Sequence, residues 1–401
     1  MLSKSHQRFS SVRCVSADVT LSQAQAWAEM AGIDHLIDLT PLDRLGLPVF
    51  ASIRPRAAGS AVTYGKGLIP VDAEVGAYME AIELYFAEPA TESVVTEWGT
   101  ARDVAGTNIR ADAILDFAPV FQKPIDLDAP LLLAVTNDVE NGKQCLVPAE
   151  LVYHPAPDIG QSLFGSSTNG LASGNSVLEA TIHALAEVIE RDIWSFEFIQ
   201  DSSFLVDPRT FPALVGDILE RADREGLQLR VRYVPNDYGL PFFSAFLFDP
   251  ENPIAQFFNG GWGCHTHRDI ALVRAVCEVA QSRLAFIHGG RKYVLPHNIG
   301  TGDREADFVR QMTAKVSSQE KMVSYSEIPD LGATETLEQE WQLLLESLRR
   351  VTDMPVYRVV YTPPDERLQV VRIIVPSLEY FKEENMRIGR RFKAALDSDD
   401  S

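Results

Sequence analysis

Three segments of the chain each carry two long polar side chains that stand three positions apart. On an α-helix such positions share one face, so each pair would present its polar heads together. The residues between the members of each pair are apolar, which indicates helices that are largely buried. Buried carboxylates are costly unless they meet a cation or hydrogen-bond donors. The three pairs are Glu80 with Glu83, Glu187 with Glu190, and Glu278 with Gln281.

Glutamates in this pattern suit a magnesium ion that carries a nucleotide. Magnesium prefers hard oxygen ligands and usually bridges carboxylates to the phosphates of a substrate. Because glutamates attract the metal and the metal attracts phosphates, a chain of net charge −20 can still bind an anion. Nearby arginines could hold the same phosphates through paired hydrogen bonds. The predicted metal ligands are Glu80, Glu83, Glu187 and Glu190, and the adjoining arginines are Arg191, Arg274 and Arg283.

A solvated helix surface is the alternative for each pair, because glutamates at this spacing are common on exposed helices. Two observations favour a site. The pairs lie on apolar helices, and two of these helices follow glycine-rich segments whose backbone can approach a ligand closely. These segments, predicted as loops, are GSAVTYGKGL with Lys66 and SSTNGLASGNS with Asn175. A further glycine-rich loop, NGGWGCHTHRD, is predicted before the third helix.

The sequence lacks the signatures of several other nucleotide, hydrolase and zinc sites. GSAVTYGKG resembles a Walker loop, but its spacing is wrong and it ends in glycine where a serine or threonine would bind magnesium. No GxGxxG follows a strand, and no GxSxG is present. Cys264, His265 and His267 have no second ligand pair at zinc spacing, so a plain loop is predicted there. His183, one turn before Glu187, is either a core histidine or a ligand.

The hydrophobic pattern predicts helices and strands interspersed along the whole chain. No proline- or serine-rich linker divides it, so one large mixed α/β unit over residues 1–401 is predicted. The polar stretch 300–333 is predicted as a mobile surface segment. Helices are predicted at 22–32, 72–88, 176–198, 269–288 and 336–351. Strands are predicted at 46–54, 145–153, 227–234, 242–248, 355–361 and 368–375.

The composition is typical of a soluble globular protein: of 401 residues, 46% are hydrophobic and 23% are charged. The net charge of −20 argues against nucleic acid or an anionic membrane as the main partner. No apolar run has the length of a membrane span or a signal peptide. Four scattered cysteines without a CxxC pair are typical of reduced thiols. The sequence therefore predicts a cytoplasmic protein.

The motifs around the polar pairs resemble those of the YcaO family over most of the chain. The most diagnostic stretch is STNGLASGNSVLEATIHALAEVIERD, and RAVCEVAQSR is similar to the family's second motif. LDRLGLPVFASIRP, GKG and AYMEAIE resemble its N-terminal part. The resemblance implies a YcaO-type fold, in which helices pack on mixed and antiparallel sheets, and a homodimer. It places the core motifs at about 60–290 and the C-terminal strands at 355–376.

The resemblance also implies roles for individual residues. The magnesium ligands would be the four glutamates named above, and the catalytic residues would be Glu187, Glu190 and Arg191. Leu84 stands where many members have arginine, so the helix around it is expected to contribute metal binding alone. The implied contacts to ATP are Arg13, Thr20, Lys66, Asn175, Glu179, Arg191, Arg274, Glu278, Gln281 and Arg283.

Members of the family use ATP and Mg2+ to activate a backbone amide of a ribosomally made peptide or protein. The same activation serves thioamidation, azoline formation and amidine closure. The C-terminus RRFKAALDSDDS lacks the proline-rich tail of azoline-forming cyclodehydratases, and VRIIVPSLEYF resembles members encoded beside a TfuA partner. The resemblance therefore favours thioamidation with a sulfide donor and a TfuA-like partner. The alternatives are an azoline-forming cyclodehydratase, a non-catalytic ATP-binding accessory protein, and a scaffold without a nucleotide site.

Overall fold

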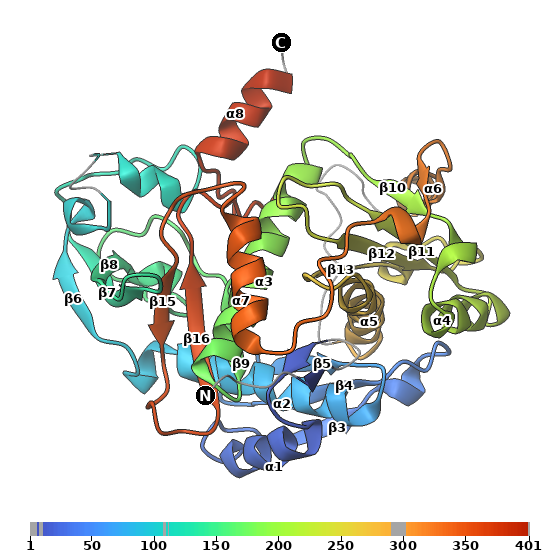
Figure 1. The fold of residues 1–401 in the computed structure, drawn as a ribbon, viewed down its shortest axis with the longest axis horizontal. Helices are drawn as coiled ribbons and strands as arrows, with labels where there is room; N and C mark the ends of the chain where they lie inside the picture. Colours follow the sequence, from blue (N-terminus) through green and yellow to red (C-terminus); the bar gives the residue numbers. More distant parts are fainter. Residues whose placement is uncertain (1–5, 8–10, 107–109, 111, 290–301, 400–401) are drawn as a thin grey trace.

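Three strands that each lead into a long helix form the centre of the molecule (Figure 1). The computed structural model describes residues 6–7, 11–106, 110, 112–289 and 302–399. In each unit the helix packs on its own strand, and the three helices carry the three polar pairs. The units are β5 (Val62–Lys66) with α2 (Pro70–Ala87), β9 (Leu171–Gly174) with α3 (Val177–Glu197), and β13 (Phe258–Cys264) with α5 (Arg268–Ile287).

Glycines in these strands let the following helix lie directly against the strand backbone. A Cβ atom added at Gly65 would lie 1.9 Å from the carbonyl oxygen of Ala73, near the start of α2. One added at Gly263 would lie 2.1 Å from the carbonyl oxygen of Ala271 in α5. A side chain cannot fit at such distances, so these glycines serve helix packing. The three glycine-rich segments were predicted as loops. This prediction was wrong for the parts that form β5, β9 and β13.

Antiparallel pairing dominates the sheets, and among the described strands only β10 and β14 pair parallel. A two-stranded sheet joins β1 (His6–Gln7) and β2 (Val12–Arg13). A three-stranded sheet has the order β3 (His35–Asp38), β4 (Val49–Ile53), β5. A six-stranded sheet has the order β6 (Thr96–Gly99), β7 (Leu131–Asp138), β15 (Tyr357–Val360), β16 (Gln369–Ile374), β9, with β8 (Gln144–Pro148) paired to β7. A five-stranded sheet has the order β13, β12 (Phe242–Phe248), β11 (Gln228–Tyr233), β10 (Phe204–Val206), β14 (Met322–Val323).

The remaining helices cover these sheets and the central helices (Figure 1). α1 (Ala17–Trp27) packs on α2, and α7 (Leu337–Leu348) packs on α3. α4 (Ala213–Arg224) and α6 (Asp303–Ser317) both contact β11, whereas α8 (Arg390–Asp399) projects from the top of the view. The mixed α/β class predicted from the sequence is confirmed by this arrangement.

Every predicted helix and strand has a counterpart whose ends differ by a few residues. The helix predicted at 22–32 begins earlier, at Ala17, and the strand predicted at 145–153 ends at Pro148. The segment 300–333, predicted as mobile surface, has regular structure in much of its described part, where α6 and β14 lie. Val309 and Val316 stand seven positions apart on α6, and both are buried, so this helix has an apolar face against the molecule.

The central helices are apolar on the side that faces the core. Ile82, Ile189 and Val279, which lie between the members of the polar pairs, are fully buried. The core position of these residues leaves the polar pairs on another side of each helix. Within the described residues, no helix has the length and hydropathy needed to cross a membrane.

Candidate nucleotide and metal site

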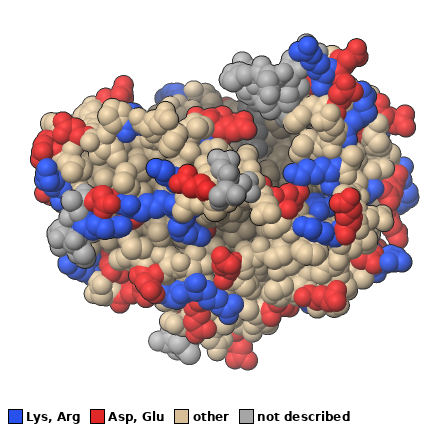
Figure 2. Space-filling view, turned by 90° about the horizontal axis from the view of Figure 1, so that it is seen from above, with Lys and Arg blue, Asp and Glu red and all other residues tan. Residues whose placement is uncertain are grey.

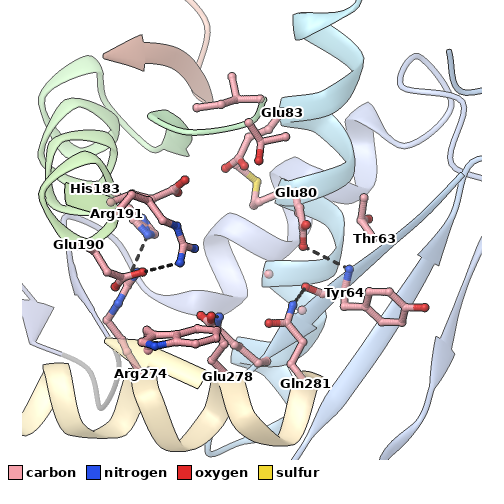
Figure 3. Close-up of a pocket in the computed structure, with 18 of the residues that line it drawn as sticks. Thr63, Tyr64, Glu80, Glu83, His183, Glu190, Arg191, Arg274, Glu278 and Gln281 are labelled. Carbon is pink, nitrogen blue, oxygen red and sulfur yellow. Dashed lines mark hydrogen bonds and ion pairs between the residues drawn. The ribbon is translucent and has the colours of Figure 1, made fainter. Parts of the chain in front are cut away.

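The polar faces of α2, α3 and α5 border one cleft with a volume of about 1200 Å³. Figure 2 shows the cleft as a hollow with acidic and basic side chains on its rim. In Figure 3 the labelled side chains of the three helices point toward one shared space. Thirteen of the residues implied by the resemblance line the cleft: Arg13, Thr20, Lys66, Glu80, Glu83, Asn175, Glu179, Glu187, Glu190, Arg191, Arg274, Glu278 and Gln281.

Arg283 is the one implied residue that does not line the cleft. Its Nε donates to Oδ1 of Asp43 at 2.9 Å, and both side chains are almost fully buried. The reason is helical geometry, because Arg283 follows Gln281 by two positions and therefore points about 200° away around α5. The structure thus gives Arg283 an ion pair within the protein in place of the implied phosphate contact.

Hydrogen bonds from β5, β9 and β13 hold glutamates of both pairs in place. Oε2 of Glu80 accepts from the backbone N–H of Tyr64 on β5 at 3.2 Å (Figure 3). The Ser173 hydroxyl of β9 donates to Glu83 at 2.5 Å. Oε2 of Glu190 accepts from the backbone N–H of Cys264 on β13 at 3.0 Å. The carboxylates are therefore held against the glycine-bearing strands.

Mutual repulsion marks the carboxylates of α2 and α3. Burial raises the pKa of Glu83 to about 8, and the charges of Glu80 and Glu187 raise it further against the hydrogen bond from Ser173. Burial also raises the pKa of Glu187, with Glu190 adding to the shift and Arg191 opposing it. A divalent cation in the cleft would relieve this repulsion, so the donor set fits a metal.

The metal that fits is one that shares its ligands with a phosphate. Among the described residues, no three His, Cys, Asp or Glu side chains form a metal site by themselves. Magnesium usually takes one or two protein carboxylates and completes its octahedron with water and substrate phosphates. Glutamates that face a large open cleft from two helices satisfy this requirement, whereas a closed structural metal site would need a tighter cluster.

Cationic side chains line the side of the cleft formed by α5 and the middle of α3. Lys66 Nζ donates to Oε2 of Glu278 at 2.5 Å. Burial would raise the pKa of Glu278, but Lys66 and Arg191 lower it to about 2, so this carboxylate is ionised and paired. Burial alone would lower the pKa of Arg191, but the carboxylates around it, chiefly Glu190 and Glu278, raise it. Arg191 therefore stays charged and can contact phosphate.

The N-terminal residues join the cleft through the start of α3. Arg13 donates to Oε1 of Glu179 at 3.1 Å, and the Thr20 hydroxyl donates to Oδ1 of Asn175 at 3.1 Å. Asn175 also donates to Glu179 at 3.0 Å. Burial opposes ionisation of Glu179, but Arg13 and the hydrogen bonds outweigh it and lower its pKa. These contacts hold β2 and α1 against the cleft.

His183 lies between two arginines of the cleft. Arg13 Nη2 is 3.3 Å from Nδ1 of His183, and Arg274 Nη1 is 3.1 Å from Nε2. Burial and both guanidinium charges hold the pKa of His183 well below its usual range, so the ring is neutral. A neutral imidazole offers one acceptor nitrogen, so only one of the two arginines can bond to it at a time. The other arginine keeps a donor for a phosphate oxygen.

Several cleft residues were not found by the sequence reasoning. Trp194 and Trp262 meet at 5.2 Å between ring centroids, and Lys382 Nζ lies 5.8 Å from the centre of the Trp194 ring. Trp194 stands seven positions after Glu187, so extending the polar face by two turns would have included it. Trp262 was missed because it lies in the glycine-rich segment that was predicted as a loop.

A family model described as "YcaO cyclodehydratase, ATP- and Mg2+-binding" matches residues 64–379. The chain belongs to the YcaO family. An uncharacterized protein of Methanothermobacter thermautotrophicus is 33% identical over 92% of this chain and 95% of its own length. An uncharacterized protein in the tfuA 3' region of Rhizobium leguminosarum bv. trifolii is 29% identical over 92% of this chain and 88% of its own length.

Solved YcaO structures share the fold. YcaO from Methanopyrus kandleri, bound with AMPPCP and Mg2+, has a TM-score of 0.78 at 22% identity and covers 97% of this chain and 98% of its own. A heterocyclase in complex with substrate and cofactor has a TM-score of 0.74 at 18% identity, over 96% of this chain and 56% of its own. ATP and Mg2+ are the cofactors of the family, and the cleft carries the carboxylates and cations that fit them.

Proposed function

We propose that the chain uses Mg-ATP to phosphorylate the oxygen of a peptide backbone amide, and that the product is a thioamide. Membership of the YcaO family supports ATP-dependent amide activation in general. The observation that supports this site is that Glu80, Glu83, Glu187 and Glu190 line one cleft together with Arg191, Arg274 and Lys66. Such a cleft can hold a metal and the polyphosphate that shares its coordination.

The amide needs activation because resonance stabilises its carbonyl carbon against attack. Hydrosulfide adds to this carbon, and the oxygen that gains the negative charge attacks the γ-phosphorus of ATP. The P–O bond to ADP breaks, the C–O bond then breaks, and phosphate leaves with the former amide oxygen. Amide, hydrosulfide and ATP thus give thioamide, ADP and hydrogen phosphate, with atoms and charge balanced.

The residues of the cleft position and stabilise these reactants. The four glutamates of α2 and α3 would hold Mg2+, which when bound neutralises charge on the phosphates. Arg191 and Arg274 donate to phosphate oxygens and orient the γ-phosphate toward the amide. The start of α3 is surrounded by Arg13, Thr20 and Asn175. These residues would contact the part of the nucleotide that lies farther from Glu187 and the metal.

The donor of the nucleophile separates this proposal from its nearest alternative. In azoline formation a Cys, Ser or Thr side chain of the substrate attacks in place of hydrosulfide, and the family description and the heterocyclase neighbours favour this second candidate. The relative in the tfuA 3' region supports a TfuA-like partner and thioamidation. We further propose a ribosomally made substrate, a homodimer and a cytoplasmic location, which the family resemblance implies.

Labelled oxygen in the target amide tests the activation step. With Mg-ATP, sulfide, a candidate peptide and the partner protein, the label is expected in inorganic phosphate. Phosphate without label would refute amide phosphorylation, and no turnover at all would favour a non-catalytic accessory protein. Thioamide formation requires sulfide and replaces the amide oxygen with sulfur. Azoline formation requires no sulfide and removes water from the peptide. Mass spectrometry of the product therefore distinguishes the two reactions.

A further inference from the structure

Two buried arginines without a carboxylate partner lie beside the cleft. Arg372 on β16 is 1% exposed, and Arg387, between β16 and α8, is 7% exposed. Both line a separate small cavity of about 40 Å³. Within the described part of the chain, neither arginine has a carboxylate within ion-pair distance. By contrast, the buried guanidinium of Arg54 pairs with Glu88 at 2.8 Å.

The hydrogen bonds of the two arginines leave donors unused. Nη2 of Arg372 donates to the carbonyl oxygen of Ser167 at 2.7 Å, and Arg387 donates to the carbonyl oxygens of Ala118 and Phe117 at 2.9 and 2.7 Å. Nε and Nη1 of Arg372 are buried and have no acceptor in hydrogen-bond geometry, although the Tyr361 hydroxyl interacts with the guanidinium. Two buried guanidinium N–H groups are costly to leave unpaired, so an acceptor is expected in the cavity.

The cavity remains positively charged at neutral pH. Burial lowers the pKa of Arg387 to about 10 and also lowers that of Arg372. Both guanidinium groups nevertheless keep their protons at pH 7. The charge of Glu187 acts on Arg372, and the charges of Glu379 and Glu150 act on Arg387, but none of these carboxylates lines the cavity. A negative ligand in the cavity would pair with both guanidinium groups directly, whereas water would supply acceptors alone.

The size and walls of the cavity restrict the ligand to a small, weakly hydrated anion. A water molecule needs about 10–15 Å³ of such space, so about 40 Å³ admits an ion with one heavy atom with room to spare. Leu151, Val188 and Leu378 supply the apolar part of the walls, and this part disfavours a strongly hydrated multivalent anion. Asn169 also lines it, and its side-chain amide can turn to donate a further hydrogen bond.

The cavity adjoins the cleft in which the amide would be activated. Ser167 and Tyr380 line both spaces. Arg372 also lies close enough to Glu187 for its charge to favour the ionised form of that carboxyl. An anion held between Arg372 and Arg387 would therefore sit next to the metal-binding face of α3.

We infer that the cavity between Arg372 and Arg387 binds hydrosulfide and holds it beside the cleft as the nucleophile for the activated amide. Hydrosulfide is monovalent, has one heavy atom and is weakly hydrated, which matches the two guanidinium charges, the small volume and the partly apolar walls. This inference rests on the thioamidation branch of the proposed function. Chloride shares the same chemistry, so the test must separate the two anions.

Bromide is a suitable probe because it resembles hydrosulfide in size and charge and gives an anomalous X-ray signal. Crystals of the wild-type chain soaked in bromide are expected to show an anomalous peak between Arg372 and Arg387. Sulfide in the soak should remove the peak at a lower concentration than chloride does. Arg372→Met should lose the peak, whereas Arg358→Met should keep it, because Arg358 on β15 contacts Thr181 and lines neither space.

Kinetics with the wild-type chain give a second arm that does not depend on a folded variant. Bromide should compete with sulfide in thioamide formation and leave the KM for ATP unchanged. In Arg372→Met the KM for sulfide should rise at least about tenfold, because hydrogen bonds to a charged group are lost.

No bromide in the wild-type cavity would overturn the inference and leave water as its content. A bromide peak without competition against sulfide would mark an adventitious ion only, and it would overturn the hydrosulfide assignment. A rate of turnover that does not depend on the sulfide concentration would also overturn the hydrosulfide assignment. Failure of the proposed function itself is read separately, from the absence of labelled oxygen in phosphate.

Discussion

The same spacing of polar residues serves two purposes on the central helices. On α2 and α3 each pair consists of two glutamates, and burial raises the pKa of Glu83, with the charges of Glu80 and Glu187 adding to the shift. On α5 the pair is already satisfied, because Lys66 binds Glu278 and the amide of Gln281 donates to the carbonyl oxygen of Tyr64. The carboxylates of α2 and α3 face the cleft, where a metal could bind them, whereas the α5 pair ties α5 to β5. Spacing alone does not separate these roles; the neighbouring charges do.

Glu187→Gln should have the largest effect, because it removes a negative charge from the proposed metal site while it keeps the volume of the side chain. We expect ATP turnover to fall at least about 100-fold, as for the loss of other groups that stabilise charge in a transition state. Turnover and thermal unfolding are measured together. Glu340→Gln is the matched control, because Glu340 is also buried but lies outside the cleft. Equal turnover in both variants would contradict the metal assignment.

The affinity for Mg2+ should depend on pH through Glu83. Because the pKa of Glu83 is about 8 instead of 4.5, metal must displace its proton at neutral pH. Below pH 8 the affinity for Mg2+ should therefore rise with pH, by up to about tenfold per pH unit, and above pH 8 it should become constant. Titration calorimetry of Mg-ATP across this range checks the slope. A Glu83→Gln chain should bind more weakly and lose the slope, and a slope that survives would assign the proton to another group.

Stability of the metal-free chain should show the opposite trend. The folded state holds a proton on Glu83 between pH 4.5 and about 8, whereas the unfolded state has released it. The free energy of unfolding due to Glu83 therefore falls as pH rises through this window and is constant above it. Mg2+ should remove the fall, because the ion stabilises the ionised carboxylate.

Glu278→Gln should have a smaller effect on catalysis, because this carboxylate is paired within the protein. We expect turnover within about fivefold of wild type, since Glu278 positions Lys66 and acts on Arg191 without holding the metal itself. The free energy of unfolding should fall by about 1–2 kcal/mol, because a quarter of the Lys66 side chain is exposed and water screens part of the charge. A loss of turnover as large as in Glu187→Gln would remove the distinction between α5 and the other two helices.

Local patterns in the sequence were sufficient to predict the helices and their polar faces. Helical periodicity involves neighbours within one or two turns, so the pairs on α2, α3 and α5 could be recognised without knowing the fold. The family and the mixed α/β class also followed from contiguous motifs, and both are confirmed. The assignment of individual residues to metal and nucleotide stays a prediction, although the structure brings all but Arg283 to one cleft.

Contacts between distant segments were beyond the reach of the sequence. Gly65 and Gly263 were predicted to lie in loops. They are needed because the backbone of a packed helix leaves no room for a side chain, and this contact exists only in the folded chain. The unpaired guanidinium N–H groups of Arg372 could not be seen either, because they arise from the way distant segments pack around β16. Such features need the tertiary structure, since no local pattern encodes which charges meet.

Arg283 gives the last and smallest prediction for activity. Asp43, its partner, lies 240 positions away in the sequence, so the motif suggested a phosphate contact that the fold replaces with a buried ion pair. Arg283→Met should leave the KM for ATP within about twofold, because the side chain faces away from the cleft. The free energy of unfolding should nevertheless fall by about 3–5 kcal/mol, because Asp43 keeps a buried, unpaired charge. Asp43→Asn in the same chain should recover part of that loss, as measured by denaturant unfolding, since it removes the uncompensated charge. A tenfold rise in the KM for ATP with unchanged stability would contradict this prediction. It would indicate that Arg283 contacts a phosphate, and that α5 is rotated about its axis in solution.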